Sequence, residues 1–353
     1  MTSATRSLSL ALLLVFAAVA APRCLARANA SVERPWSAPH PQFDFHSGFW
    51  INLHHFLYEE AASQDVGPRP TRSEPLSTAD RTIVAALSPD EQQVWSSAIA
   101  YYKAHFLERD LLTNDAMRLL KNRLEDSEAA PTLARSRIDP GLAGVLNRAA
   151  PVYRAHWWRE HDRANHAWID AVSPLIDQHG KALSEQLSAA FAAPWPGRPI
   201  RVDVVAYANW AGAYTTLLPS RITISSVDSR NQQIAALEVL FHEASHTLIE
   251  GVGGTLIRDF AARKKSAPRD LWHALLFFTV GFYVQRIYPD YVPYADSNHL
   301  WERGFSLPFH DVLAADWQPH LEGEKSLAQA ISDLAADLVA PPNKTKPSGP
   351  GKS

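Results

Sequence analysis

The spacing of hydrophobic residues predicts a mainly helical first half of the chain. In the stretch FDFHSGFWINLHHFLYEEAAS, aromatic and aliphatic residues recur at the helical period, which predicts a helix over 46–62. The start signal Ser88-Pro89-Asp90-Glu91 precedes another apolar pattern. We expect further helices over 89–108, 114–125, 139–169 and 172–192, the last opening near Ser173-Pro174.

The pattern changes after the segment APWPGRP, whose prolines and glycine end the preceding helix. The stretches IRVDVVAYA and RITISS alternate apolar with polar residues and are rich in β-branched side chains, so they predict two or three short strands. Helices are expected to follow over 229–249, 270–287 and 323–338, the first of them ended by Gly251, Gly253 and Gly254.

These elements predict an α+β protein that is mainly helical. The expected regions are a signal peptide over 1–30, a helical N-terminal region over 31–195, a core with the strands over 196–340 and a disordered tail over 341–353. The tail, PPNKTKPSGPGKS, has the composition of a segment that does not fold.

The N-terminus is typical of a secretory signal peptide. Arg6 precedes an apolar run from about Leu8 to Ala21, and Ala28 and Ala30 form an A-x-A arrangement. We expect cleavage near Ala30 and export to the periplasm or the medium; an uncleaved anchor is the alternative. The apolar run LWHALLFFTVGFYV is too short to span a bilayer, so no integral membrane segment is expected in the mature chain.

Composition narrows the possible partners. The formal net charge is -3, and removal of the three arginines of the expected signal peptide, which contains no acid, gives -3 - 3 = -6. No block of basic residues alternates with aromatic ones, so a nucleic acid partner is not expected. The single cysteine, Cys24, lies in the signal peptide. The mature chain must therefore fold on its hydrophobic core without disulfides, and its oligomeric state is not readable.

One short motif carries the candidate chemistry. In LEVLFHEASHTLIEG, residues 237–251, His242 and His246 are four apart and therefore lie on one helix face, about 40° apart around the axis. Glu243 lies beside them, where it could reach a water on a bound ion. Zinc binds neutral imidazole and lowers the pKa of its water to about 7. A chance H-E-x-x-H is expected only about 0.03 times in such a chain, which favours a metal site over an ordinary buried helix.

The motif resembles the active-site helix of the zincin metallopeptidases, next to a small sheet. The resemblance covers residues 200–290, with a layout closest to gluzincin-like enzymes, and implies that His242 and His246 are zinc ligands and Glu243 is the catalytic base. It implies a zinc-dependent hydrolase, a metallopeptidase acting on peptides or proteins with a zincin-like catalytic core over 196–340, and the predicted signal peptide makes this an exported enzyme. The alternatives are a non-catalytic zinc- or ligand-binding protein on the same scaffold and a helical structural protein without metal.

The third ligand departs from the well-known branches of this superfamily. A metzincin would need glycine and histidine where Ile249 and Val252 stand, and Glu250 is about 12 Å along the helix from His242. The helix over 270–287 contains no glutamate of the gluzincin kind, but it carries His273 near its start, which we predict to be the third ligand. The remaining candidates are Asp270, which could instead cap the helix, His299 and Glu302.

Other candidates carry weaker signals. Tyr294 is a candidate hydrogen-bond donor to a developing oxyanion, and Tyr291 is its alternative. His54 and His55 could line a cleft, although a role in the core is the more common one for such residues. The strand ITISS could pair with an extended peptide if it forms the edge of the sheet.

Overall fold

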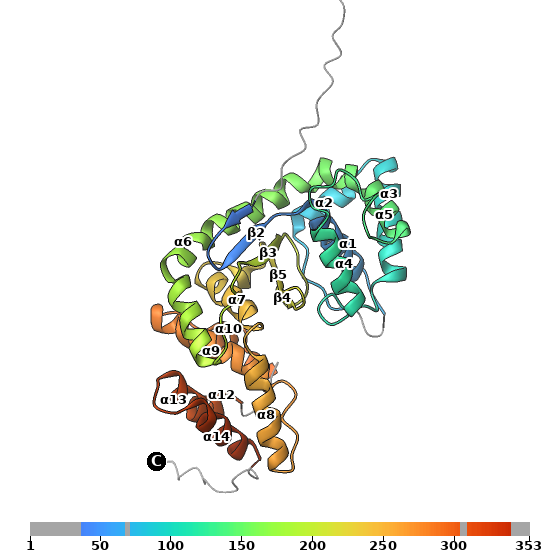
Figure 1. Ribbon diagram of the computed structural model, residues 1–353. Coiled ribbons are helices and arrows are strands. Elements are labelled where there is room, and N and C mark those ends of the chain that lie inside the picture. Colours follow the sequence, from blue (N-terminus) through green and yellow to red (C-terminus); the bar gives the residue numbers. More distant parts are fainter. Residues whose placement is uncertain (1–36, 68–70, 304–308, 340–353) are drawn as a thin grey trace, which may run out of the picture. The chain divides into compact units, whose positions relative to one another are not determined.

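The computed structural model describes residues 37–67, 71–303 and 309–339 of the chain. In this part of the chain helices predominate, and the strands form a single sheet (Figure 1). The predicted mainly helical α+β class is confirmed. The predicted signal peptide over 1–30 and the predicted tail over 341–353 lie outside the described residues.

The sheet has five strands in the order β1-β2-β3-β5-β4. They are β1 (Ser37–Pro39), β2 (Phe43–His46), β3 (Ile200–Val205), β4 (Ala213–Thr216) and β5 (Arg221–Ser225). Strands β2, β3 and β5 run parallel, while β1 is antiparallel to β2 and β4 is antiparallel to β5. Strand β5, which contains the stretch ITIS, is therefore interior. The sequence allows ITISS to form the edge of the sheet, but β4 occupies that edge. The chain reverses through residues 217–220, so β4 pairs with β5 on its outer side.

The first half of the chain forms the expected helices with shifted bounds and one further helix, Thr78–Ala86, that is not predicted from the sequence. They are α1 (Phe49–Ser63), α2 (Thr78–Ala86), α3 (Pro89–His105), α4 (Asp115–Glu125), α5 (Pro140–Tyr153) and α6 (Arg159–Ala190). The predicted start of α3 is confirmed, since Ser88 and Glu91 form a capping box. A π-helical turn, Arg154–Trp158, joins α5 to α6.

The helix break expected at Ser173-Pro174 is wrong, because α6 runs through Pro174 without interruption. An interior proline costs a helix about 3 kcal/mol. Here Val172 and Ile176, on either side of the proline, are both buried in the core. Their burial offsets that cost and keeps α6 continuous.

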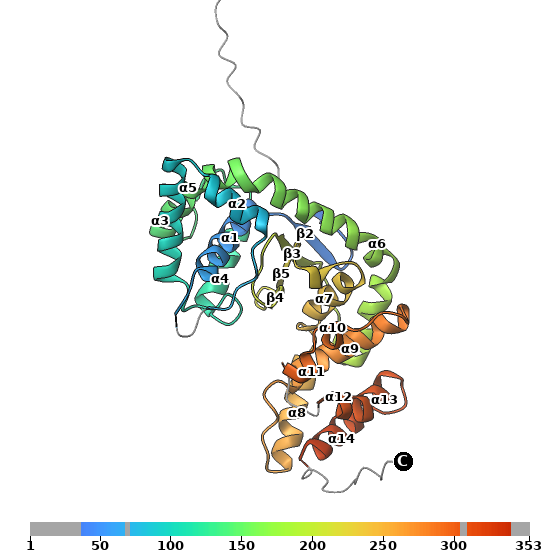
Figure 2. The same ribbon diagram turned by 180° about the vertical axis from the view of Figure 1, so that it is seen from behind.

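The second half contains the remaining helices (Figures 1 and 2). They are the 3-10 turn Ser229–Asn231, α7 (Ile234–Ser245), α8 (Glu250–Ala262), α9 (Leu271–Ile287), α10 (Tyr294–Ser297), α11 (Leu300–Arg303), α12 (Phe309–Val312), the π-helical turn Leu313–Trp317, α13 (Gln318–Leu321) and α14 (Leu327–Val339).

The helix expected over 229–249 is shorter than predicted. Helix α7 ends at Ser245 with His246 as its C-cap, and Gly251, Gly253 and Gly254 lie inside α8 instead of ending α7. The residues Val252, Leu256 and Phe260 of α8 are four apart and all buried. This continuous apolar face packs into the core and stabilises a helix that its glycines disfavour.

Two clusters of buried side chains surround the sheet. One contains residues of β2, α6, α7, α9 and α14, and the other contains residues of α1, α3 and α5 together with the end of β3. Strand β2 pairs in parallel with β3, so residues on both sides of the expected boundary at 195 share one sheet. None of the described helices is both long enough and apolar enough to cross a bilayer.

Candidate metal centre

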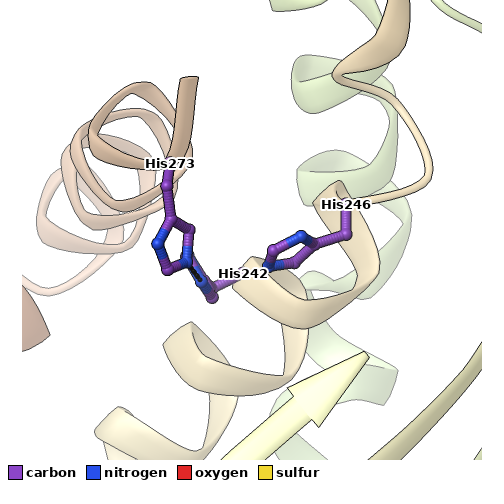
Figure 3. A group of neighbouring side chains, drawn as sticks. All are labelled: His242, His246 and His273. Atoms are coloured by element: carbon purple, nitrogen blue, oxygen red, sulfur yellow. Dashed lines mark hydrogen bonds between the residues drawn. The ribbon is translucent and has the colours of Figure 1, made fainter. Parts of the chain in front are cut away.

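Three histidines from two helices meet beside the sheet. Helix α7 packs against β4, β5, α6 and α9, and it brings His242 and His246 to the face opposite the start of α9. His273 lies in the first turn of α9. Figure 3 shows the three imidazole rings pointing toward one another. The structure thus brings together the two motif histidines and the histidine predicted as the third ligand.

The ring nitrogens are close enough to share an ion. The Nε2 atoms of His242 and His273 lie 3.2 Å apart, and one nitrogen from each of the three rings lies within 4.8 Å of the others. Two nitrogens bound to one tetrahedral zinc at about 2.0–2.1 Å are about 3.4 Å apart. The group formed by His242, His246 and His273 could therefore hold a metal ion. No fourth histidine, cysteine, aspartate or glutamate of the described residues joins it.

Burial keeps these histidines in the form that binds metals. It lowers the pKa of His242 well below its ordinary value, lowers the pKa of His246 to about 3 and lowers that of His273 to about 4. The neighbouring imidazoles lower the pKa of His242 and His246 further, because a second positive charge nearby is unfavourable. All three rings are thus neutral near pH 7, and a neutral imidazole nitrogen is the one with a free lone pair.

Glu243 is buried next to the histidines, and strand β4 holds it in place. The Thr215 hydroxyl lies 2.7 Å from Glu243 Oε2 and 2.8 Å from the Glu243 main-chain oxygen. Burial raises the pKa of the Glu243 carboxyl to about 7, although the hydrogen bond from Thr215 and the charge of Lys121 act in the opposite direction. Glu243 Oε2 is 3.8 Å from His246 Nε2. The carboxyl therefore sits beside the group of histidines and is not a member of it.

Aromatic rings surround the three histidines. The Phe277 ring is stacked on His242 with centroids 3.7 Å apart and an angle of 23° between the planes. The Trp272 ring stacks on His273 and meets His246 edge-on, while 38% of Trp272 stays exposed. The histidines are thus packed between rings, with Trp272 at the solvent-facing side.

Tyr294 lies one ring further away. Its ring is nearly parallel to that of Phe277, with centroids 5.8 Å apart, and its main-chain N–H donates to the buried carboxyl of Glu238 over 2.9 Å. Burial raises the pKa of the Tyr294 hydroxyl to about 12, and Glu243 is among the charges that act on it. Tyr291 lies against Glu238 instead, and burial together with the charge of that carboxyl raises the pKa of the Tyr291 hydroxyl.

The other candidates for the third ligand lie outside the group. Asp270 occupies the N-cap position of α9 without accepting a capping hydrogen bond through its side chain, and its charge acts on His273. His299 and Glu302 are exposed and pair with each other over 3.7 Å. Glu250 is exposed at the start of α8.

His54 and His55 are buried in the core, far along the chain from the metal motif. His54 Nδ1 lies 2.7 Å from the Tyr102 hydroxyl, while His55 contacts the Ile51 carbonyl through Nδ1 and the Tyr214 hydroxyl through Nε2. These contacts fit a role in the core and do not indicate that the two histidines line a cleft.

Several residues around the histidines, among them Thr215 and Phe277, are not predicted from the sequence. Thr215 belongs to a strand of only four residues, which gives a weak sequence pattern. Phe277 lies within an apolar run whose pattern indicates only a buried helix. The sequence offers one signal for Phe277: it follows His273 by four residues, and residues four apart lie on the same face of a helix. Comparison with known proteins found no matching family model, no matching curated protein and no matching solved structure.

Proposed function

We propose that this chain is a zinc-dependent hydrolase that cleaves peptide bonds. The observation that carries the proposal is the convergence of His242, His246 and His273, with Glu243 buried beside them. This ligand set suits zinc, which is often held by three protein ligands in catalytic sites. The resemblance to zincin metallopeptidases in the H-E-x-x-H helix and the adjacent sheet supports the same assignment.

In the proposed mechanism Glu243 is the general base. His242, His246 and His273 would hold the zinc ion, which would act as a Lewis acid and make a water molecule a better nucleophile. The Glu243 carboxylate takes a proton from the attacking water and returns it to the leaving amine nitrogen. The Thr215 hydroxyl fixes the orientation of this carboxylate. The Tyr294 hydroxyl donates a hydrogen bond to the oxyanion that develops on the substrate.

The position of β4 as the last strand of the sheet supports an extended peptide as the substrate. The Ser225 N–H donates to the Gly212 carbonyl, in the register that pairs Ala213 with Ile224. Hydrogen-bonded and non-bonded pairs alternate along an antiparallel ladder, so the main-chain groups of Ala213 and Thr215 point away from β5. A peptide can add to this edge as a further strand. Thr215 would then place the peptide backbone next to Glu243.

The test compares Glu243→Gln with Glu250→Gln in the purified mature protein. Both variants should keep the fold and about one zinc per chain. Loss of the general base should slow hydrolysis of a broad peptide library by about 10²- to 10⁴-fold in Glu243→Gln. The exposed Glu250→Gln variant should cleave like the wild type.

Two outcomes would overturn the peptidase proposal. A zinc-loaded wild type that cleaves no library member would favour a zinc- or ligand-binding protein on the same scaffold, and so would a Glu243→Gln variant as fast as the wild type. Export is a separate part of the proposal. It predicts that the mature protein recovered from the periplasm or medium begins after Ala30, which its intact mass would show.

A further inference from the structure

His242 lacks the support that metal-binding histidines ordinarily have. Such residues almost always donate their second ring N–H to a carboxylate, a carbonyl or water, and this hydrogen bond fixes the ring. The Nε2 atom of His242 faces His273. Its Nδ1 atom is buried and has no hydrogen-bond partner among the described residues. No protein group among the described residues therefore fixes this ring through a hydrogen bond to Nδ1.

The ring of Phe277 covers the face of His242. The centroids of the two rings are 3.7 Å apart and the planes are inclined by only 23°. Phe277 follows His273 by four residues on α9, so both side chains leave the same face of that helix toward α7. Helix α9 therefore carries both His273 and the ring that covers His242.

Two other neighbouring rings hold Phe277 in place. The Tyr294 ring lies nearly parallel to it, at an angle of 12° and a centroid distance of 5.8 Å. The His273 ring meets it at 53° over 5.0 Å. The Tyr294 main chain is in turn anchored to α7 by the hydrogen bond to Glu238. Phe277 is thus fixed in place and presents a flat surface to His242.

We propose that Phe277 is a positioning residue that orients the imidazole of His242 for metal binding, in place of the usual hydrogen bond to Nδ1. This inference rests on the proposed metal centre. A stacked ring restricts rotation about the Cβ–Cγ bond of His242, because turning the imidazole out of plane would bring its edge into the face of Phe277. The Nε2 atom then stays directed at the position where the nitrogens of His246 and His273 converge.

The experiment measures metal affinity and ligand geometry in the full mature chain. Zinc affinity is determined by competition with a chromophoric chelator, and the geometry is followed by the visible absorption of the cobalt(II)-substituted protein. The variants are Phe277→Leu and Phe277→Met, which keep an apolar side chain without an aromatic face. The control is Phe278→Leu, which removes a similarly half-buried ring that faces Trp301 and His310 instead.

Both Phe277 variants should bind zinc about 10- to 100-fold more weakly, the range found when the outer support of a metal ligand is removed. Their cobalt(II) spectra should change, while Phe278→Leu matches the wild type in both measurements. The inference is wrong if Phe277→Leu binds as tightly as Phe278→Leu with an unchanged spectrum, or if the metal-free Phe277 variants are unfolded, since the ring would then act as core. A wild type that binds no metal would instead overturn the metal centre itself.

Discussion

Helices α1 and α7 lie in different core clusters, yet both are almost entirely buried and both present a pair of histidines. The imidazole centroids are 5.4 Å apart for His54 and His55 and 5.2 Å apart for His242 and His246. Burial lowers the pKa of His55 to about 4 and the pKa of His246 to about 3. Neither ring proximity nor a depressed pKa therefore separates a core pair from candidate metal ligands.

The difference lies in where the ring nitrogens point. Adjacent residues on a helix project about 100° apart, so His54 and His55 turn to separate partners, Tyr102 and Tyr214. Residues four apart project only about 40° apart, and His242 and His246 converge with His273 on one point. In this molecule, spacing along the helix separates a hydrogen-bonded core pair from a group that can hold an ion.

The largest expected effect is on metal content. The proposed function predicts about one zinc per chain in the wild type, and His246→Ala and His273→Ala should each lose this zinc, because two ligands rarely hold zinc tightly. His55→Gln, from the comparison pair, should keep it. Elemental analysis of the purified proteins measures the zinc content of each variant. Equal zinc in His246→Ala and wild type would remove the distinction drawn between the two helices.

A smaller effect is expected from the rings around the centre. In the proposed mechanism Tyr294 is the oxyanion donor, so Tyr294→Phe should retain zinc and lower kcat by about 10²- to 10³-fold. Tyr291→Phe should lower it much less, since that hydroxyl lies against Glu238. Steady-state kinetics on one cleaved peptide compare the two variants. If Tyr291→Phe is the slower enzyme, the alternative assignment of the oxyanion donor is correct.

The residues that share one helical turn were the predictable part of the site. The relation of His242, Glu243 and His246 follows from local helix geometry alone. His273 needed only the further expectation that the helix over 270–287 packs against the motif helix. The contact of Thr215 with Glu243 depends on the pairing of β4 with β5, which is tertiary information. Phe277 depends on the rotation of α9 about its axis.

The fold, like the site, could be predicted only where local sequence patterns determine the structure. Long helices with a clear start signal, such as α3, or a continuous apolar run, such as α9, could be predicted to within a few residues. Strand β2, with only four residues directly before α1, could not be separated from the helical pattern that follows it. Local propensity predicts a helix start at Ser173-Pro174 and a helix end at Gly251, Gly253 and Gly254, yet these residues lie inside α6 and α8. Burial of one face keeps both helices continuous.

The buried pair on α1 should make stability depend on pH. His55 has a pKa of about 4 when folded and about 6.5 when unfolded, so the unfolded state takes up its proton first as the pH falls. The resulting stability is present above pH 6.5 and is lost toward pH 4, by about 3 kcal/mol for a shift of about 2.5 units.

The measurement is urea unfolding of the metal-free wild type and of His55→Gln between pH 7.5 and pH 4. The free energy of unfolding should fall less steeply with acidification in His55→Gln. Carboxyls with a raised pKa, such as Glu74, act in the opposite direction but equally in both proteins, so they cancel in the difference. Identical pH profiles would contradict a neutral, buried His55.

The smallest effect is expected at the surface pair that competes with His273 for the role of third ligand. His299 and Glu302 are 54% and 71% exposed in their side chains and lie 3.7 Å apart. Solvent screens such a pair, so Glu302→Gln should change the free energy of unfolding by less than about 0.5 kcal/mol. Zinc affinity should be unchanged, because Glu302 is not part of the group that converges on one point. Chelator competition on Glu302→Gln beside His273→Ala measures zinc affinity, and urea unfolding of Glu302→Gln measures the change in the free energy of unfolding. Loss of zinc in Glu302→Gln with retention in His273→Ala would assign the third ligand to the carboxylate and leave His273 as a core residue like His55.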